Sequence, residues 1–376
     1  MSESVDKYAD IRPYNDDEVA DSVSRLIADN AFVDVIAKYN LPRFLSNFPF
    51  ITRPLVRSHL RKKWGDTSSV EQVQHEVADY LNKLITRTTS EVTFSGIDKL
   101  DPKQAYLFIS NHRDIVLDPA LVNWGLFKHN MPTVRIAIGD NLLQIPYITE
   151  LMRLNKSFIV KRSAKAPKEM LKALSQLSAY IYDSLAEGHS IWIAQKEGRA
   201  KDGFDQTDPA LLKMLQLQGR KQKKEFAEYV RELKIVPVSI SYQYEPCAIA
   251  KAKELYHKQQ HGQYVKQQGE DIASIVEGFS TAKGHVHLAF GEPIESGCES
   301  PEELAKTIDQ QIVDSFFLHP GNYIAGGCTQ AVIDEEDAAA FNERLAKVPE
   351  ELKPLVLAMY AKPFHRKAEL ATSESK

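Results

Sequence analysis

Apolar and polar residues follow two different patterns along the chain, and the pattern changes near residue 90. From Asp16 to about Thr89, apolar residues recur at the spacing of amphipathic helices. The first such set is Val19, Val23, Leu26 and Ile27. After Ser90, short apolar runs alternate with helical patterns. The runs that predict strands are Val92–Ser95, Tyr106–Ser110, Thr133–Ile138, Ser157–Lys161, Ser190–Ala194, Ile235–Ser241 and His285–Phe290. The main helical patterns between them are Pro119–Lys128, Lys168–Glu187 and Asp208–Leu233.

The alternation of strands and helices predicts an α/β fold. We expect a mostly parallel twisted sheet flanked by helices, with a smaller N-terminal helical region. Gly188 is expected to cap the helix that precedes the strand at Ser190. The predicted domains are a helical N-terminal region (1–89), an α/β domain (90–330) and a helical C-terminal tail (331–376). Residues 1–15 and the last residues of the tail are expected to be frayed.

Composition narrows the class of protein. Hydrophobic residues make up 43% of the 376 residues and charged residues 26%, as in globular proteins. The formal net charge of −4 argues against general nucleic-acid binding. No apolar stretch approaches the roughly 18 residues of a membrane-spanning helix, and the polar N-terminus shows no secretory signal. We therefore expect a cytoplasmic protein, either free or resting on the inner membrane face. The cysteines, expected to be free thiols, are Cys247, Cys298 and Cys328.

The segment from Leu41 to Trp64 combines many aromatic and aliphatic side chains with six cations. One interpretation is an interfacial segment that touches an anionic bilayer. The other is a helical hairpin whose apolar side packs on the domain while its basic side faces water. The sequence leaves both interpretations open.

Candidate chemistry begins with His112, which follows the apolar run Tyr106–Ser110 and precedes a helix start. A side chain in this position lies at the end of a strand, where open α/β sheets build their active sites. A histidine held by a carboxylate can take a proton from an alcohol near neutral pH. Asp118 is the first candidate for that carboxylate and Asp114 is the alternative. This arrangement is suited to acyl transfer to a hydroxyl.

Two further strands end in basic residues. Lys161 and Arg162 follow the run Ser157–Val160, and Arg162 could bind a phosphate through its planar fork. The strand Ser190–Ala194 leads into a polar loop that contains Lys196, Glu197, Gly198 and Arg199. In this loop the two cations could hold phosphate, the carboxylate could orient a cation or the substrate headgroup, and the glycine would allow close approach of a ligand. Solvated surface charges are the alternative for both sets.

A fourth segment, Val236-Pro237-Val238, is apolar and is expected to serve in packing or as a wall of an acyl pocket. In this order, the four blocks resemble those of the glycerolipid acyltransferase family. The first resembles the family's Asn-His followed by an Asp, the second its apolar strand ending in arginine, the third its Glu-Gly-Thr-Arg, and the fourth its Val-Pro-Val segment. The resemblance covers roughly residues 92–295.

The resemblance implies transfer of a fatty acyl group from acyl-CoA or an acyl carrier protein to glycerol 3-phosphate or 1-acylglycerol 3-phosphate (lysophosphatidate). His112 would be the general base and Asp118 would fix its tautomer. The acceptor phosphate would be held by Arg162, Lys161, Arg199 and Lys196, with Glu197 and Gly198 in the same loop. Neither a metal nor a cofactor is implied.

Two features differ from the family pattern. Five residues separate His112 from Asp118 where the family has four, so either a one-residue bulge restores the contact or Asp114 takes over. The third block also lacks the family's threonine and the proline before it. The alternatives are an acyltransferase of the same fold that acts on another lipid acceptor, and a catalytically silent lipid-binding scaffold. A cysteine hydrolase is disfavoured because no cysteine is expected at a strand-to-helix turn beside a candidate base.

Overall fold

The computed structural model describes residues 6–41, 48–267, 269–328 and 333–373. The chain forms two compact units, each built from two stretches of sequence. The first unit takes in Met1–Tyr80 and Arg135–Tyr180, and the second Leu81–Val134 and Ile181–Lys376. The domain boundaries expected from the sequence, at residues 89/90 and 330/331, divide the chain into consecutive segments. These boundaries stay predictions.

The first unit is mainly helical, as the rhythm of its sequence predicts. Its elements are α1 (Asp16–Ala28), α2 (Asn30–Asn40), α4 (Pro49–Trp64), most of α5 (Val70–Thr88), β3 (Arg135–Gly139), the short η2 (Asp140–Leu142), α7 (Pro146–Leu154), β4 (Ser157–Val160) and most of α8 (Pro167–Ala186). The apolar face predicted for α1 is buried, and it packs with Phe32, Val56 and Leu154 in one hydrophobic core. The two strands β3 and β4 pair in parallel.

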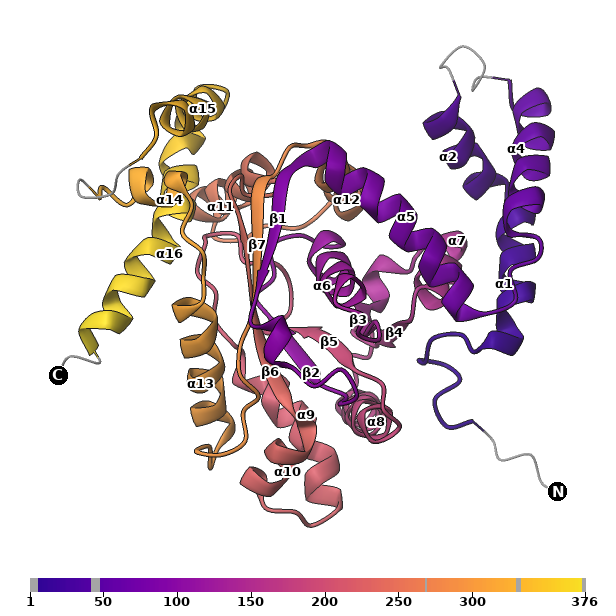
Figure 1. Cartoon of the computed structure of the whole chain (residues 1–376), viewed down its shortest axis with the longest axis horizontal. Helices are drawn as coiled ribbons and strands as arrows, with labels where there is room; N and C mark the ends of the chain where they lie inside the picture. The colour runs from indigo at the N-terminus through magenta and orange to yellow at the C-terminus, as the bar shows by residue number, and fades with distance from the viewer. Residues whose placement is uncertain (1–5, 42–47, 268, 329–332, 374–376) are drawn as a thin grey trace. The chain divides into compact units, whose positions relative to one another are not determined.

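The second unit holds the remaining strands. They are β1 (Thr89–Ser95), β2 (Leu107–Ser110), β5 (Ile191–Ala194), β6 (Ile235–Tyr242) and β7 (Gly284–Phe290). Its helices are η1 (Ile97–Lys99), α6 (Leu117–Lys128), α9 (Pro209–Lys221), α10 (Phe226–Leu233), α11 (Ala248–His261), α12 (Glu270–Ser280), α13 (Pro301–Asp314), α14 (Pro320–Ala325), α15 (Glu335–Ala346), η3 (Glu350–Leu352) and α16 (Lys353–Ser373). Figure 1 labels most of these elements.

The five strands of the second unit lie in the order β1-β7-β6-β2-β5. Pairing is parallel for β1 with β7, for β6 with β2 and for β2 with β5, whereas β6 and β7 are antiparallel. Every residue of β2 and β6 is buried, which is typical of central strands covered on both faces. Helix α13 packs on β6 (Figure 1). The predicted α/β fold, with a mostly parallel sheet flanked by helices, is confirmed.

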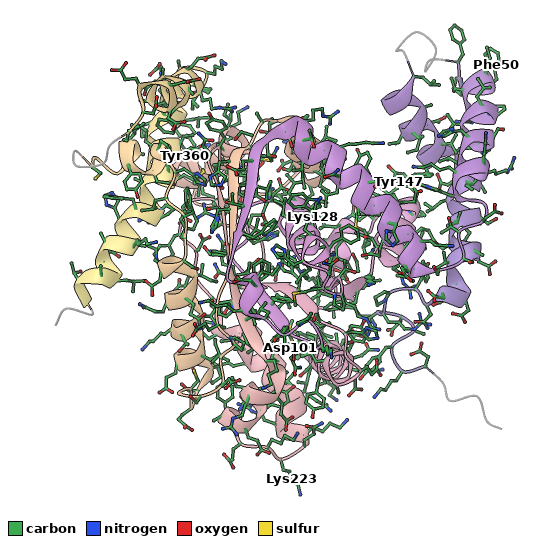
Figure 2. All side chains as sticks on the ribbon, viewed as in Figure 1. Phe50, Asp101, Lys128, Tyr147, Lys223 and Tyr360 are labelled. Atoms are coloured by element: carbon green, nitrogen blue, oxygen red, sulfur yellow. The ribbon has the colours of Figure 1, made fainter. Side chains whose placement is uncertain are left out.

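Three local predictions have clear outcomes. All seven predicted strands are present within a few residues of their expected ends, and Gly188 follows α8 with a left-handed φ of +86°. The single helix predicted for Asp208–Leu233 is wrong. It is two helices, because the backbone turns at Lys223, whose φ is +58°, and Figure 2 shows Lys223 at the tip of that turn. No helix among the described residues is long and apolar enough to cross a bilayer.

The expectation that residues 1–15 are frayed is also wrong for residues 6–15. Ile11 is 2% exposed, and its carbonyl accepts a hydrogen bond from the amide of Ile159 at 2.8 Å within the first unit. Burial of an apolar side chain together with a satisfied backbone group holds this stretch in place. Residues 1–5 and the end of the tail after residue 373 lie outside the described part of the chain.

Candidate active site

The site begins where β2 ends, and Asn111 fixes the chain at that point. The Asn111 side-chain oxygen accepts a hydrogen bond from the amide of Ile240 at 2.8 Å, and its Nδ2 donates to the Ile240 carbonyl at 2.9 Å. The pairing of β2 with β6 stops at Ser110 and Val238. The Asn111 amide therefore continues the ladder by one step and sets the position of the next residue, His112.

His112 and Asp118 are in direct contact. Nδ1 of His112 lies 2.8 Å from Oδ2 of Asp118, whose carboxylate is fully buried, while the histidine side chain is 14% exposed. Because an ionised carboxylate only accepts hydrogen bonds, the proton of the neutral ring sits on Nδ1 and leaves the lone pair on Nε2. The rings of Trp192 and His112 are steeply inclined, at 69°, with their centroids 5.8 Å apart. The imidazole is arranged to accept a proton.

The turn between the two residues accommodates the longer spacing. Oδ2 of Asp118 also accepts from the backbone amides of Arg113 at 2.6 Å and Asp114 at 2.9 Å, so the intervening chain folds around this oxygen. Asp114 points elsewhere: its Oδ1 accepts from the amides of Val116 and Leu117 and caps the start of α6. Asp118, not Asp114, is the residue that contacts His112, and Asp114 holds the turn that makes this contact reachable.

The two carboxyl groups differ in their electrostatics. Burial opposes ionisation of Asp118, but hydrogen bonds from His112 and Tyr242 and from the turn outweigh it and hold its pKa below the usual range. Burial raises the pKa of Asp114, and the nearby charge of Asp118 raises it further. Oδ2 of Asp114 is buried without a hydrogen-bond partner in the described part of the chain. Asp118 is thus the more readily ionised carboxyl group of the two.

Sequence reasoning missed a buried ion network behind the turn. Nη2 of Arg113 pairs with Asp205 at 2.5 Å and Nη1 with Glu245 at 3.2 Å. Nζ of Lys251 lies 2.6 Å from Glu245 and donates to the carbonyl of Arg113 at 2.7 Å. Arg113, Asp205 and Lys251 are buried and the Glu245 side chain is 9% exposed, and the two positive and two negative charges balance. The one signal in the sequence is that Arg113 directly follows the candidate base; its partners are distant in sequence.

The polar loop after β5 reaches the same turn. The amide of Ala200 donates to the carbonyl of His112 at 2.8 Å, and Gly198 has a left-handed φ of +77° that glycine adopts without strain. Nη2 of Arg199 donates to the Ser274 hydroxyl at 3.2 Å, whereas its Nη1 is buried without a hydrogen-bond partner among the described residues. The predicted Arg199 therefore lies in the unit that holds the dyad, with hydrogen-bonding capacity left over.

Four other residues of the predicted phosphate site are Lys196, Glu197, Lys161 and Arg162. Lys196 donates to the carbonyl of Phe204 at 3.3 Å, and Glu197 is exposed. Lys161 and Arg162 belong to the first unit. There Lys161 pairs with Asp10, and the backbone amide of Arg162 donates to Asp140 at 3.1 Å. The grouping of these four residues around one phosphate stays a prediction.

A histidine–carboxylate pair at the end of a parallel strand is an arrangement that can act as a general base. Residues 91–243 match the model of the Acyltransferase family. The match spans all four blocks singled out in the sequence. No curated protein matches the chain.

Several solved structures match as well. One is the crystal structure of the 1-acyl-sn-glycerophosphate (LPA) acyltransferase PlsC from Thermotoga maritima. The sequences are 17% identical, the alignment covers 77% of this chain and 92% of that chain, and the TM-score is 0.38. Among the described residues, no group of three His, Cys, Asp or Glu side chains is arranged to hold a metal ion.

Proposed function

We propose that the protein transfers a fatty acyl group from a thioester donor, acyl-CoA or acyl carrier protein, to a hydroxyl of glycerol 3-phosphate or 1-acylglycerol 3-phosphate. The observation that supports this most is the contact of His112 Nδ1 with Asp118 at 2.8 Å, which leaves Nε2 to face a substrate. The match of residues 91–243 to the Acyltransferase family model supports acyl transfer as the chemistry. The glycerolipid acceptor follows from the resemblance of the four sequence blocks.

In the proposed reaction, Nε2 of His112 removes the proton of the acceptor hydroxyl as its oxygen attacks the thioester carbonyl. Asp118 stabilises the imidazolium that forms. Collapse of the tetrahedral intermediate breaks the carbon–sulfur bond, and the thiolate leaves with the proton returned by His112. The products are the acyl ester and the free thiol of the donor.

Acceptor binding is proposed for the basic residues. Arg199 is the strongest candidate, since one end of its guanidinium is held by Ser274 while Nη1 has no protein partner among the described residues. A guanidinium held in this way suits a phosphate dianion. Lys196 would add positive charge, and Glu197 and Gly198 would shape the loop. A part for Lys161 and Arg162 in acceptor binding stays a prediction.

Contact with a membrane face is proposed for α4. On this helix Val56 and Leu60 are buried in the core of the first unit, whereas Phe50 and Leu55 are 74% and 61% exposed. Figure 2 shows the ring of Phe50 pointing away from the helix. Exposed apolar side chains on a helix that also carries cations suit an interface with anionic lipid. Residues 42–47 of the predicted interfacial segment lie outside the described part of the chain.

The deciding experiment offers purified protein glycerol 3-phosphate and its 1-acyl form, each with both donors, and identifies the products by liquid chromatography. We expect phosphate-bearing acyl esters from wild type and none from His112→Ala. His59→Ala, a change of an exposed histidine on α4, is the matched control. An active, folded His112→Ala protein would reject the mechanism. Activity on a phosphate-free lipid acceptor that survives Arg199→Met would instead favour the alternative acceptor.

A further inference from the structure

Tyr242, the last residue of β6, reaches the second oxygen of the candidate carboxylate. Its hydroxyl donates to Oδ1 of Asp118 at 2.7 Å, and its side chain is buried. Tyr242 pairs with Val286 of β7, so its backbone is fixed by the sheet. A rigid strand therefore delivers this donor to the dyad across 124 residues of sequence.

The hydroxyl completes the hydrogen bonding of the carboxylate. Oδ2 of Asp118 accepts from His112 and from the two amides of the turn, while Oδ1 accepts from Tyr242. Burial and the negative charge of Asp118 raise the pKa of Tyr242 well above its ordinary value, so the phenol keeps its proton. It therefore serves Asp118 as a permanent donor.

Resting on the proposed function, we propose that Tyr242 is a positioning residue that fixes the Asp118 carboxylate toward His112 and tempers the basicity of the pair. The hydrogen bond orients the plane of the carboxylate because it anchors the oxygen that does not face the ring. It also withdraws negative charge from that carboxylate. Without this donor, the Asp118 carboxylate would carry more negative charge. The His112–Asp118 pair would then keep its proton up to a higher pH.

Other charged groups face the pair and bear on its titration. Arg113 and Asp114 lie in the turn, and the charges of Glu245 and Lys251 act on Tyr242 and Asp114 respectively. All of them are retained when only the hydroxyl is removed. A change of Tyr242 to phenylalanine therefore isolates the contribution of one hydrogen bond.

The test compares wild type, Tyr242→Phe and the control Tyr244→Phe across pH, with thiol release as the readout. Tyr244 lies under the guanidinium of Arg344 and outside the dyad. For Tyr242→Phe we expect kcat to fall about 10- to 100-fold, as for loss of a hydrogen bond to a charged group. The acid limb of the kcat profile should move about one unit to higher pH. Tyr244→Phe should match wild type in both.

Each outcome decides between roles. An unchanged acid limb in Tyr242→Phe, with or without a lower rate, means that the residue only packs and overturns the proposal, while an inactive His112→Ala keeps the proposed function intact. An active His112→Ala rejects the proposed function itself. If Tyr242→Phe fails to fold, a fluorinated tyrosine at position 242 keeps the hydroxyl and makes it a stronger donor. The acid limb should then move to lower pH, and an unmoved limb overturns the proposal.

Discussion

The side chains of His112 and Asp118 meet at 2.8 Å although five residues lie between them. The contact depends on a turn that folds around one carboxylate oxygen and is capped by Asp114. The extra residue, compared with the family pattern, is absorbed in this turn and does not displace the acid. The spacing of a motif can thus vary while the distance between its reacting groups stays the same.

Replacement of Asp118 by asparagine should remove most of the activity. The amide cannot stabilise an imidazolium by charge, and its NH₂ group can donate to Nδ1 and favour the wrong tautomer. We expect kcat to fall on the order of 10³- to 10⁴-fold, measured as thiol release from an acyl thioester. Asp98→Asn, a change of an exposed residue in η1, is the control. A folded Asp118→Asn protein with near-normal kcat would contradict the role of the pair.

Replacement of Arg113 by methionine should destabilise the second unit. The change leaves Asp205 buried without its guanidinium, and loss of one partner from a buried ion pair costs about 3–5 kcal/mol. Urea unfolding followed by circular dichroism measures the free energy of unfolding. The exposed Arg220, changed to methionine, should stay within about 0.5 kcal/mol of wild type. Adding Asp205→Asn to Arg113→Met should recover part of the loss, because Glu245 keeps its ion pair with Lys251, and no recovery would argue against a charge effect.

The sequence predicts the strands well because they are buried apolar runs. Strand β6, Ile235–Tyr242, is one such run. All its residues are buried, and a strand buried on both faces needs the continuous apolar sequence from which it was predicted. The break at Lys223 was not predictable in this way. A lysine in the left-handed region leaves no signal in a helical pattern that continues on both sides of it.

For the site, the sequence shows which residues are candidates but not which of them touch. Both Asp114 and Asp118 lie near His112 along the chain, and only the fold of the turn decides between them. The pairing of Arg113 with Asp205 and Glu245 joins residues 92 and 132 positions apart, which periodicity and spacing do not reveal. The catalytic and phosphate-binding roles of the predicted residues stay predictions until they are tested by substitution.

Replacement of Asp114 by asparagine should stabilise the protein at neutral pH. Burial, with the charge of Asp118, raises the pKa of Asp114 above its ordinary 3.8, so ionising this group in the folded state lowers stability as pH rises from about 3.8 through its folded pKa. Asparagine keeps the acceptor that caps α6 and cannot ionise. We expect a gain of about 1 kcal/mol in the free energy of unfolding near pH 7.

The gain from Asp114→Asn should disappear below about pH 4, where the carboxyl is protonated in both the folded and the unfolded state. Urea titrations at a series of pH values measure this dependence. Asp98→Asn again serves as the control, because its side chain is exposed. A gain of equal size at every pH would attribute the effect to packing, and a loss at neutral pH would mean that the folded protein uses the ionised form.

Removal of the exposed apolar side chains of α4 should weaken binding to anionic vesicles. Phe50 and Leu55 are largely exposed, so Phe50→Ser/Leu55→Ser should leave the free energy of unfolding close to that of wild type. A fully buried side chain of this size contributes about 1.5–3 kcal/mol, so loss of two should lower vesicle affinity at least about tenfold. Co-sedimentation with phosphatidylglycerol-containing vesicles measures the affinity. Val265 is 76% exposed and lies on the second unit, so Val265→Ser is the matched control. Equal binding by wild type and the double variant, or an equal loss in Val265→Ser, would remove α4 as the membrane contact.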